Sequence, residues 1–394
     1  MRGSIIKRSK DSWSVILNLG RDPSTGKRKQ QWVTVKGPKK AAEKRLAELQ
    51  HQLDTGGYIK PDKVTLGSFL DRWLQDYVWP NLSAETAQAY DIMARKHLIP
   101  ALGNIPLQQL TPARVQAYYT QKLTSGRRDG KGGLSPRTVH HHHELLHVAL
   151  ESAVKWQLVQ RNVADSVDAP KYRPKEMRTF GQESMLEFLE SVRATEYYPV
   201  FYTALFTGMR RSELLALRWS DLDLDLGVIS INRSLHHLED KSFVFQPPKT
   251  PKSRRQVPLS PSTSIMLRQH RDSQRAARLL IDHPVTENDL VFCQVDGRPL
   301  LPHSVSQAWR RLVRQAGFPG IRLHDARHTH ATLMLEQGLN WKKISERLGH
   351  TSVAMTLGLY AHASPGLQQA AAQGFDRVFD HVADASEISQ ATQA

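Results

Sequence analysis

Three separated segments of the second half of the chain carry side chains suited to binding and attacking a phosphate. The first segment is TGMRRSEL with Arg210, the second is HDARHTHAT with His324 and Arg327, and the third is LGHTSVAMTLGLYAH with His350 and Tyr360. Two arginines, two histidines and a tyrosine can hold a phosphodiester, neutralise its extra charge at the pentacoordinate stage and attack it covalently. Together the segments predict phosphoryl transfer to a tyrosine.

Local sequence patterns indicate how two of these segments present their side chains. The Thr207-Gly208 pair interrupts one helix, and Arg210 lies where the next helix begins. Backbone N–H groups at such a helix start favour an anion. His324 and Arg327 are three residues apart, so a helix places them on one face.

These three segments resemble the signature of the tyrosine recombinase (phage integrase) family in residue type, order and spacing, over residues 175 to 375. The resemblance implies that Tyr360 is the nucleophile, which takes the scissile phosphate as a 3′-phosphotyrosine and releases a 5′-hydroxyl. It implies that Arg210 and Arg327 grip the non-bridging oxygens, because an arginine fork makes two charge-assisted bonds to phosphate. His324 and His350 would supply hydrogen bonds and proton transfer.

The same resemblance implies two further site residues and no cofactor. The family places a lysine in a β-hairpin turn as the general acid for the leaving oxygen; in PPKTPKSRRQVPL we assign Lys249, with Lys252 as the alternative. Glu213 matches an acidic residue that supports the site without touching the phosphate. Exchange of a phosphodiester for a phosphotyrosine ester conserves bond energy, so neither ATP nor a metal is required.

Periodicity and composition predict a mainly α protein with small β elements (α+β) in three domains, the architecture that the resemblance also implies. The predicted parts are a small three-stranded sheet with a helix (1–60), a helical domain (65–170), a basic linker (171–178), a mixed α/β domain (179–382) and a flexible tail (383–394). The resemblance implies that the first is an arm-type DNA-binding domain, the second a core-binding domain and the mixed domain the catalytic one.

Strand and helix signals give more detail within these domains. Strands are expected at 13–19 and 30–35, followed by a helix over 39–53, and three more strands at 227–232, 242–246 and 256–259. In the helical domain a helical pattern runs from Thr65 to Tyr77. Ser83 is expected to cap a helix over 84–97, and Thr111-Pro112 and Ser135-Pro136 mark two further helix starts.

The charge balance points to nucleic acid as the partner. The 54 Lys and Arg residues exceed the 38 Asp and Glu residues, which gives a formal charge of +16, and residues 1–60 alone carry +9. Such a surplus attracts a polyanion. With the resemblance it predicts binding to double-stranded DNA at core and arm-type sites as a homotetramer, in which Gly366 to Val382 docks on a neighbour. An accessory DNA-bending or directionality protein is a further candidate partner.

No segment has the roughly 20 apolar residues needed to cross a bilayer, so no membrane partner is expected. The sequence has one cysteine, Cys293, which cannot form an internal disulfide. We therefore expect a cytoplasmic protein, associated with the nucleoid of a bacterial host.

One competing motif is an H-E-x-x-H match at His143 to His147, a spacing that can bind zinc with the glutamate activating water. It lies beside further histidines, and no downstream sequence supplies a third ligand at the usual spacings. We interpret it as a polar helix face, and metal analysis tests this choice.

Two other functions compete with an integrase that inserts and excises mobile DNA. A type IB topoisomerase uses similar chemistry but relaxes supercoils without exchanging partners. A DNA-binding regulator could retain the site as a relic, although the set of residues is complete.

Overall fold

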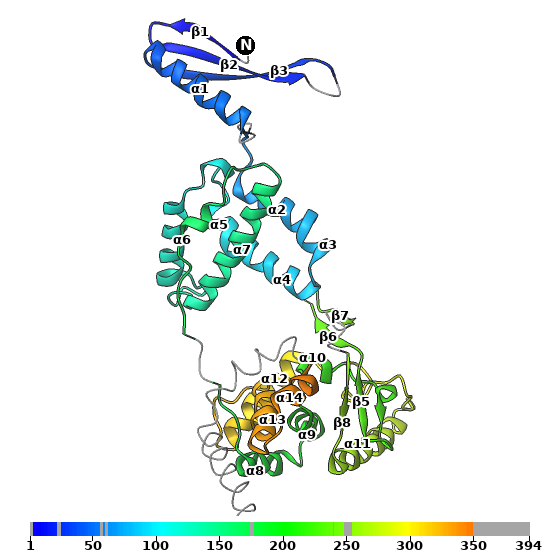
Figure 1. The fold of residues 1–394 in the computed structure, drawn as a ribbon. Helices are drawn as coiled ribbons and strands as arrows, with labels where there is room; N and C mark the ends of the chain where they lie inside the picture. Colours follow the sequence, from blue (N-terminus) through cyan, green and yellow to red (C-terminus); the bar gives the residue numbers. More distant parts are fainter. Residues whose placement is uncertain are drawn as a thin grey trace, which may run out of the picture. The chain divides into compact units, whose positions relative to one another are not determined.

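The computed structural model divides the chain into two units, Met1–Pro174 and Lys175–Ala394 (Figure 1). It describes residues 3–21, 25–55, 58–59, 62–173, 177–238, 240–247 and 254–349. The predicted basic linker spans the division, while the exact domain bounds given above stay a prediction. Among the described residues, no helix is both long and apolar enough to cross a membrane.

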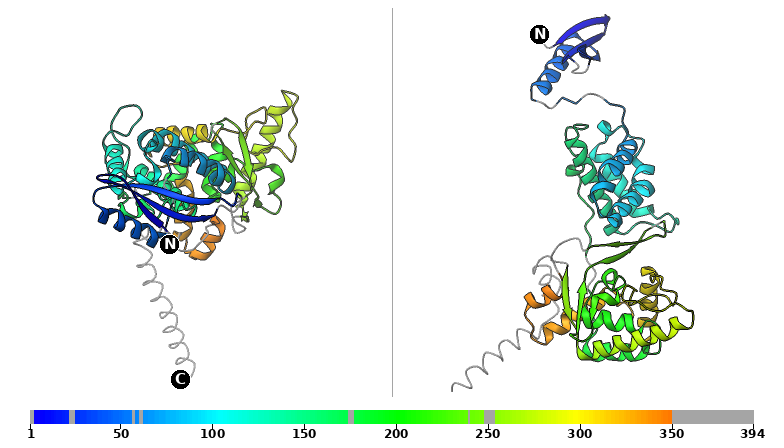
Figure 2. Two further views of the ribbon diagram at one scale, coloured as in Figure 1. Left: turned by 90° about the horizontal axis from the view of Figure 1, so that it is seen from above. Right: turned by 90° about the vertical axis from the view of Figure 1, so that its right-hand side faces the viewer.

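The first unit begins with a three-stranded antiparallel sheet covered on one face by a helix, as both views show (Figures 1 and 2). The elements are β1 (Gly3–Ser9), β2 (Ser12–Arg21), β3 (Arg28–Lys36) and α1 (Lys39–Asp54). Alternate residues of β2 turn towards α1, so Val15 and Leu17 are buried with Ala42 and Leu49. The predicted sheet and helix are confirmed.

The rest of the first unit is helical and has its own core around Trp73 and Tyr119. Its helices are α2 (Leu66–Trp73), α3 (Trp79–Asn81), α4 (Ala84–Met93), α5 (Ile99–Leu102), α6 (Pro112–Ser125) and α7 (Pro136–Lys155). The links α2–α3 and α4–α5 are π-helical turns, Leu74–Val78 and Ala94–Leu98. Pro80 and Pro100 follow them, and a proline lacks the N–H that would continue an α-helical ladder.

The predicted helix starts in this region are correct, but one predicted cap is not. Thr111 and Ser135 accept hydrogen bonds from the N–H groups of Arg114 and Thr138. Ser83 precedes α4 without capping it, because its hydroxyl bonds to the Thr86 hydroxyl instead.

The second unit combines seven described helices with two small antiparallel sheets (Figure 1). The helices are α8 (Gln182–Val192), α9 (Tyr198–Thr207), α10 (Arg211–Leu214), α11 (Pro261–Leu279), α12 (Pro302–Gln315), α13 (Asp325–Glu336) and α14 (Trp341–Leu348). The strands are β4 (Leu222–Asp223), β5 (Val228–Ile231) and β8 (Arg255–Pro258) in one sheet, and β6 (Ser234–His237) and β7 (Phe243–Gln246) in the other.

Three of these five strands were predicted, and the other two lack a readable pattern. β4 is two residues long, and β6 has the sequence SLHH, in which one residue is apolar. The α+β class is nevertheless confirmed. One apolar core includes Phe188, Phe201 and Trp309, and α13 packs against both α9 and α14.

Candidate active site

The first predicted segment forms a tight connection between α9 and α10. Gly208 ends α9 in the left-handed region at φ 64°. A Cβ there would lie 2.6 Å from the Leu348 side chain and 2.8 Å from the His330 ring, so this close approach requires glycine. Arg210 follows in extended conformation as the residue before α10.

Glu213 holds Arg210 through two atoms of that arginine. Its Oε2 accepts the Arg210 backbone N–H at 2.9 Å, and its Oε1 accepts Nη1 of the guanidinium at 2.7 Å. The Glu213 side chain is 7% exposed and that of Arg210 is 35% exposed. The carboxylate therefore fixes the arginine from the protein side, while part of the Arg210 side chain stays exposed.

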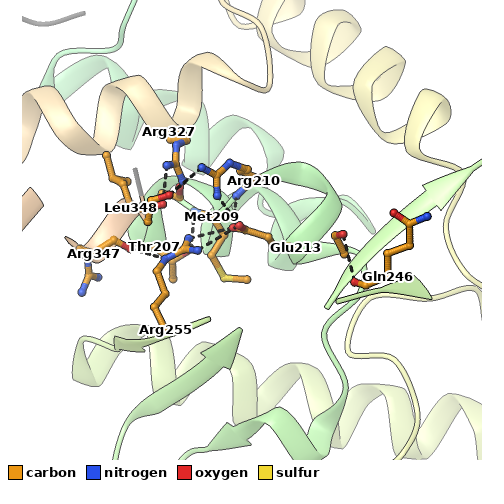
Figure 3. A network of polar contacts seen from close by, with 12 residues as sticks. Thr207, Met209, Arg210, Glu213, Gln246, Arg255, Arg327, Arg347 and Leu348 are labelled. Atoms are coloured by element: carbon orange, nitrogen blue, oxygen red, sulfur yellow. Dashed lines mark hydrogen bonds and ion pairs between the residues drawn. The ribbon is translucent and has the colours of Figure 1, made fainter. Parts of the chain in front are cut away.

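The second predicted segment forms the start of α13. Arg327 lies in the first turn and is buried, with Nη1 donating to the Gly208 carbonyl at 2.9 Å and Nη2 to the Leu348 carbonyl at 2.5 Å. Arg210 donates from Nη2 to the next carbonyl, that of Gly349, at 3.0 Å. The two arginines thus meet at the end of α14, although Arg210 and Gly349 are 139 positions apart (Figure 3).

Electrostatics at the site favour an ionised carboxylate and a neutral imidazole. Burial alone would raise the pKa of Glu213, but hydrogen bonds and charge from Arg255, together with Arg210, outweigh it and lower that pKa. Burial removes water from around His324, and this desolvation lowers the pKa of its imidazole. The nearby positive charges of Arg327 and Arg210 lower that pKa further. A neutral imidazole can accept a proton, which suits the proton-transfer role.

His330, which sequence reasoning gave no role, holds the end of α14 through Arg347. Arginine only donates, so Nε2 of His330 accepts from Nε of Arg347 at 2.9 Å, and Nδ1 donates to the Leu205 carbonyl at 3.0 Å. Burial and the Arg347 charge lower the pKa of His330 to about 3. The ring is therefore neutral in one tautomer.

Sequence reasoning missed Arg255, which begins β8. Its Nη1 and Nη2 donate to the two oxygens of Glu213 at 3.1 and 3.0 Å, and its Nε donates to the Arg347 carbonyl at 2.7 Å. In SRRQVPL nothing distinguishes it from Arg254 beside it. The only signal is spatial, because β8 lies against α14.

The structure brings together Arg210, Glu213 and Arg327, and the charges of both arginines act on His324. Lys249, its alternative Lys252, His350 and Tyr360 lie outside the described residues. Their places at the site stay predictions.

The H-E-x-x-H residues lie on α7, and each histidine has a partner of its own. His143 shares a hydrogen bond with the Tyr119 hydroxyl at 2.9 Å, and His147 is paired with Asp165 at 2.8 Å. Glu144 instead contacts His141 at 2.7 Å. In the part of the chain that the structure describes, no group of three His, Cys, Asp or Glu side chains could hold a metal ion.

Sequence comparisons with known proteins match two parts of the chain. The sequence model of the phage integrase family matches residues 175–366, and that of the phage integrase N-terminal SAM-like domain matches residues 65–123. A tyrosine recombinase XerC-like protein of Caldanaerobacter subterraneus subsp. tengcongensis is 26% identical over 395 residues, covering 95% of this chain and 98% of its own.

Solved structures share the fold. The Tn1549 transposon integrase has a TM-score of 0.66 at 21% identity, over 79% of this chain and 99% of its own. A lambda integrase has a TM-score of 0.54 at 19% identity, over 88% of this chain and 92% of its own. With two family models matched in their natural order and an integrase fold around the arginine pair, the chain belongs to the phage integrase family of tyrosine recombinases.

Proposed function

We propose that this protein is a site-specific DNA recombinase that integrates or excises mobile DNA through a covalent 3′-phosphotyrosine on Tyr360. The observation that carries the proposal is the meeting of Arg210 and Arg327 at adjacent carbonyls at the end of α14, with an Arg210 side chain that is partly exposed. Two cations on one backbone segment can bind the two non-bridging oxygens of one phosphate. His350 follows that segment directly, and Tyr360 follows ten residues later.

Each residue then has one task in a balanced exchange. The Tyr360 oxygen forms a bond to phosphorus and gives up its proton, which the neutral imidazole of His324 can accept. The bond from phosphorus to the 5′-oxygen breaks, and Lys249 gives that oxygen a proton. Arg210, Arg327 and His350 stabilise the charge on the non-bridging oxygens, and Glu213 holds Arg210. Religation to another 5′-hydroxyl reverses these steps, with neither ATP nor metal.

DNA and further copies of the chain are the partners. The Tn1549 integrase was solved with a circular intermediate DNA, and the lambda integrase as a tetramer bound to a Holliday junction. We infer the same arrangement here: a homotetramer in which residues 1–60 bind arm-type sites and residues 65–170 and 179–382 clamp the core site. The net charge of +16 favours this polyanionic partner, in the nucleoid of a bacterial cytoplasm.

Strand relaxation alone, as by a type IB topoisomerase, is the competing function. The relatives named above are a recombinase and integrases, and they give it no support. The two activities separate in a paired assay, with recombination between two sites beside relaxation of a supercoiled plasmid.

The proposal is tested with Tyr360→Phe on duplexes made from the DNA that flanks the coding region. The variant should retain gel-shift binding, lose the covalent adduct and lose recombination, because phenylalanine has no attacking oxygen. Recombination by the variant at the wild-type rate would falsify the assignment of the nucleophile.

A further inference from the structure

The last three described carbonyls of the α14 end each accept a hydrogen bond from a different guanidinium. Nε of Arg255 donates to the Arg347 carbonyl at 2.7 Å. Nη2 of Arg327 donates to the Leu348 carbonyl at 2.5 Å. Nη2 of Arg210 donates to the Gly349 carbonyl at 3.0 Å. Carbonyls at a helix end lack intrahelical partners and carry partial negative charge. Cations are therefore favoured there, and two of the three belong to the proposed site.

Arg255 is the third cation, and it joins this helix end to Glu213. Its side chain is 6% exposed, and the Glu213 side chain that it contacts is 7% exposed. Glu213 in turn holds the backbone N–H and the guanidinium of Arg210. One side chain thus links Glu213, the carboxylate that supports Arg210, to the end of α14 (Figure 3).

These contacts require the shape of a guanidinium. Three nitrogens of one plane are used at once, two on a carboxylate and one on a carbonyl. A lysine ammonium is a point charge and cannot reproduce that fork, even where it keeps the positive charge. A break in this contact would let Glu213 and the end of α14 move independently.

We propose that Arg255 is a positioning residue for strand transfer, which sets the orientation of Arg210 through Glu213 and holds the end of α14 beside it. It does not touch the DNA. This inference rests on the proposed function, because it assigns Arg255 a part in the same chemistry.

Gly349 lies against the Arg255 side chain. It has φ +65°, and a Cβ there would lie 2.8 Å from Nη1 and 3.0 Å from Cδ of Arg255. Gly338, just after α13, has a similar φ of +79° and no atom within 4 Å of a Cβ. A side chain would cause similar backbone strain at both glycines. They differ in that a Cβ at Gly349 would meet Arg255, and in that the Gly349 carbonyl accepts a hydrogen bond from Arg210.

The first test compares Arg255→Gln and Arg255→Lys with the wild-type full-length chain on a nicked suicide duplex. Adduct formation is measured against DNA concentration, so that the rate at saturation separates from the half-saturating concentration. We expect the saturated rate to fall by about 100-fold in both variants, since misplacement by about 1 Å costs that much. The half-saturating DNA concentration should stay within about 3-fold, because Arg255 does not touch DNA.

A double-mutant cycle separates positioning from general destabilisation. In a Glu213→Gln background, where the link to Arg210 is already weakened, Arg255→Gln should lower the saturated rate much less than it does in the wild type. A variant that only loosens the fold would lower the rate by the same factor in both backgrounds.

The second test leaves Arg255 in place, so it still tests the inference if the Arg255 variants fail to fold. Gly349→Ala should lower the saturated rate by at least about 10-fold through a displaced guanidinium, while Gly338→Ala should stay within about 2-fold. Equal effects of the two alanines, or a wild-type saturated rate in Arg255→Lys, would overturn the inference. If the wild type itself forms no Tyr360-dependent adduct, the proposed function fails instead, so the two failures are distinguishable.

Discussion

The end of helix α14 and the middle of helix α7 are both crowded with nitrogen-bearing side chains, but they are organised in opposite ways. At α14, arginines from three distant segments meet on consecutive carbonyls. On α7, three histidines that are close in sequence turn to three separate partners: His142 to Tyr118, His143 to Tyr119 and His147 to Asp165. Side chains from distant segments that meet in space therefore indicate a functional site better than a local sequence motif that matches perfectly.

The largest effect should come from removing one of the converging arginines. We expect Arg210→Ala and Arg327→Ala each to lower the saturated rate of adduct formation by about 10²- to 10³-fold, the usual cost of losing one positioned donor. DNA affinity in a gel shift should change by far less, because many other cations bind the backbone.

The matched control for these variants is Arg298→Ala. Its side chain is 73% exposed and pairs with Asp296 in a surface turn. We expect a rate within about 2-fold of wild type, since an exposed pair contributes little. A rate for Arg327→Ala equal to that of Arg298→Ala would mean that the arginines at the end of α14 have no special part in the reaction.

The next effect concerns acid stability on α7. Burial lowers the pKa of His142 from 6.5 to about 4, a difference of about 3 kcal/mol. The unfolded chain takes up this proton below about pH 6.5 while the folded chain does not, so stability is lost as pH falls from 6.5 to 4. His142→Phe should remove most of this loss, as measured by hydrogen exchange of α7 peptides against pH.

Peptides from α13 provide the internal control for that experiment. Burial also lowers the pKa of His328 there to about 4, so their acid sensitivity should persist in His142→Phe. An α7 that stays equally acid-sensitive in the variant would mean that another group on that helix takes up the proton.

The smallest effect is expected at the motif that matches a zinc site. His147 and Asp165 form a pair in which the two side chains are 43% and 58% exposed. Because an exposed pair contributes little, His147→Ala should change the free energy of unfolding by less than about 1 kcal/mol. Excess zinc should change the free energy of unfolding of the wild type and of the variant by the same amount. Zinc that stabilises the wild type alone, or copurifies at one ion per chain, would restore the metal interpretation.

The family resemblance carried by residue type and spacing singled out Arg210, Glu213 and Arg327. The structure brings these three residues together at helix starts, and their roles in the reaction stay predictions. Arg255 could not be singled out in this way, because its neighbours in sequence are also basic and its importance arises only where β8 passes Glu213 and α14. Short contacts between distant segments leave no periodic signal.

The same contrast holds for the fold. The helix starts after Thr111 and Ser135 depend on local sequence and were predicted, whereas strand β6 depends on its pairing with β7 and was missed. The π-helical turns before Pro80 and Pro100 were also missed, although the prolines that follow them are visible in the sequence.

In the proposed reaction, the scattered arginines serve one phosphate that one tyrosine attacks. This is tested most directly by mass spectrometry of the peptide that remains linked to DNA after reaction with a nicked suicide duplex. We expect a single modified residue, Tyr360, joined to a 3′-phosphate, and at least about 10²-fold less linked peptide in Arg327→Ala at the same early reaction time. A link to any other residue, or to a 5′-phosphate, would contradict the proposed reaction.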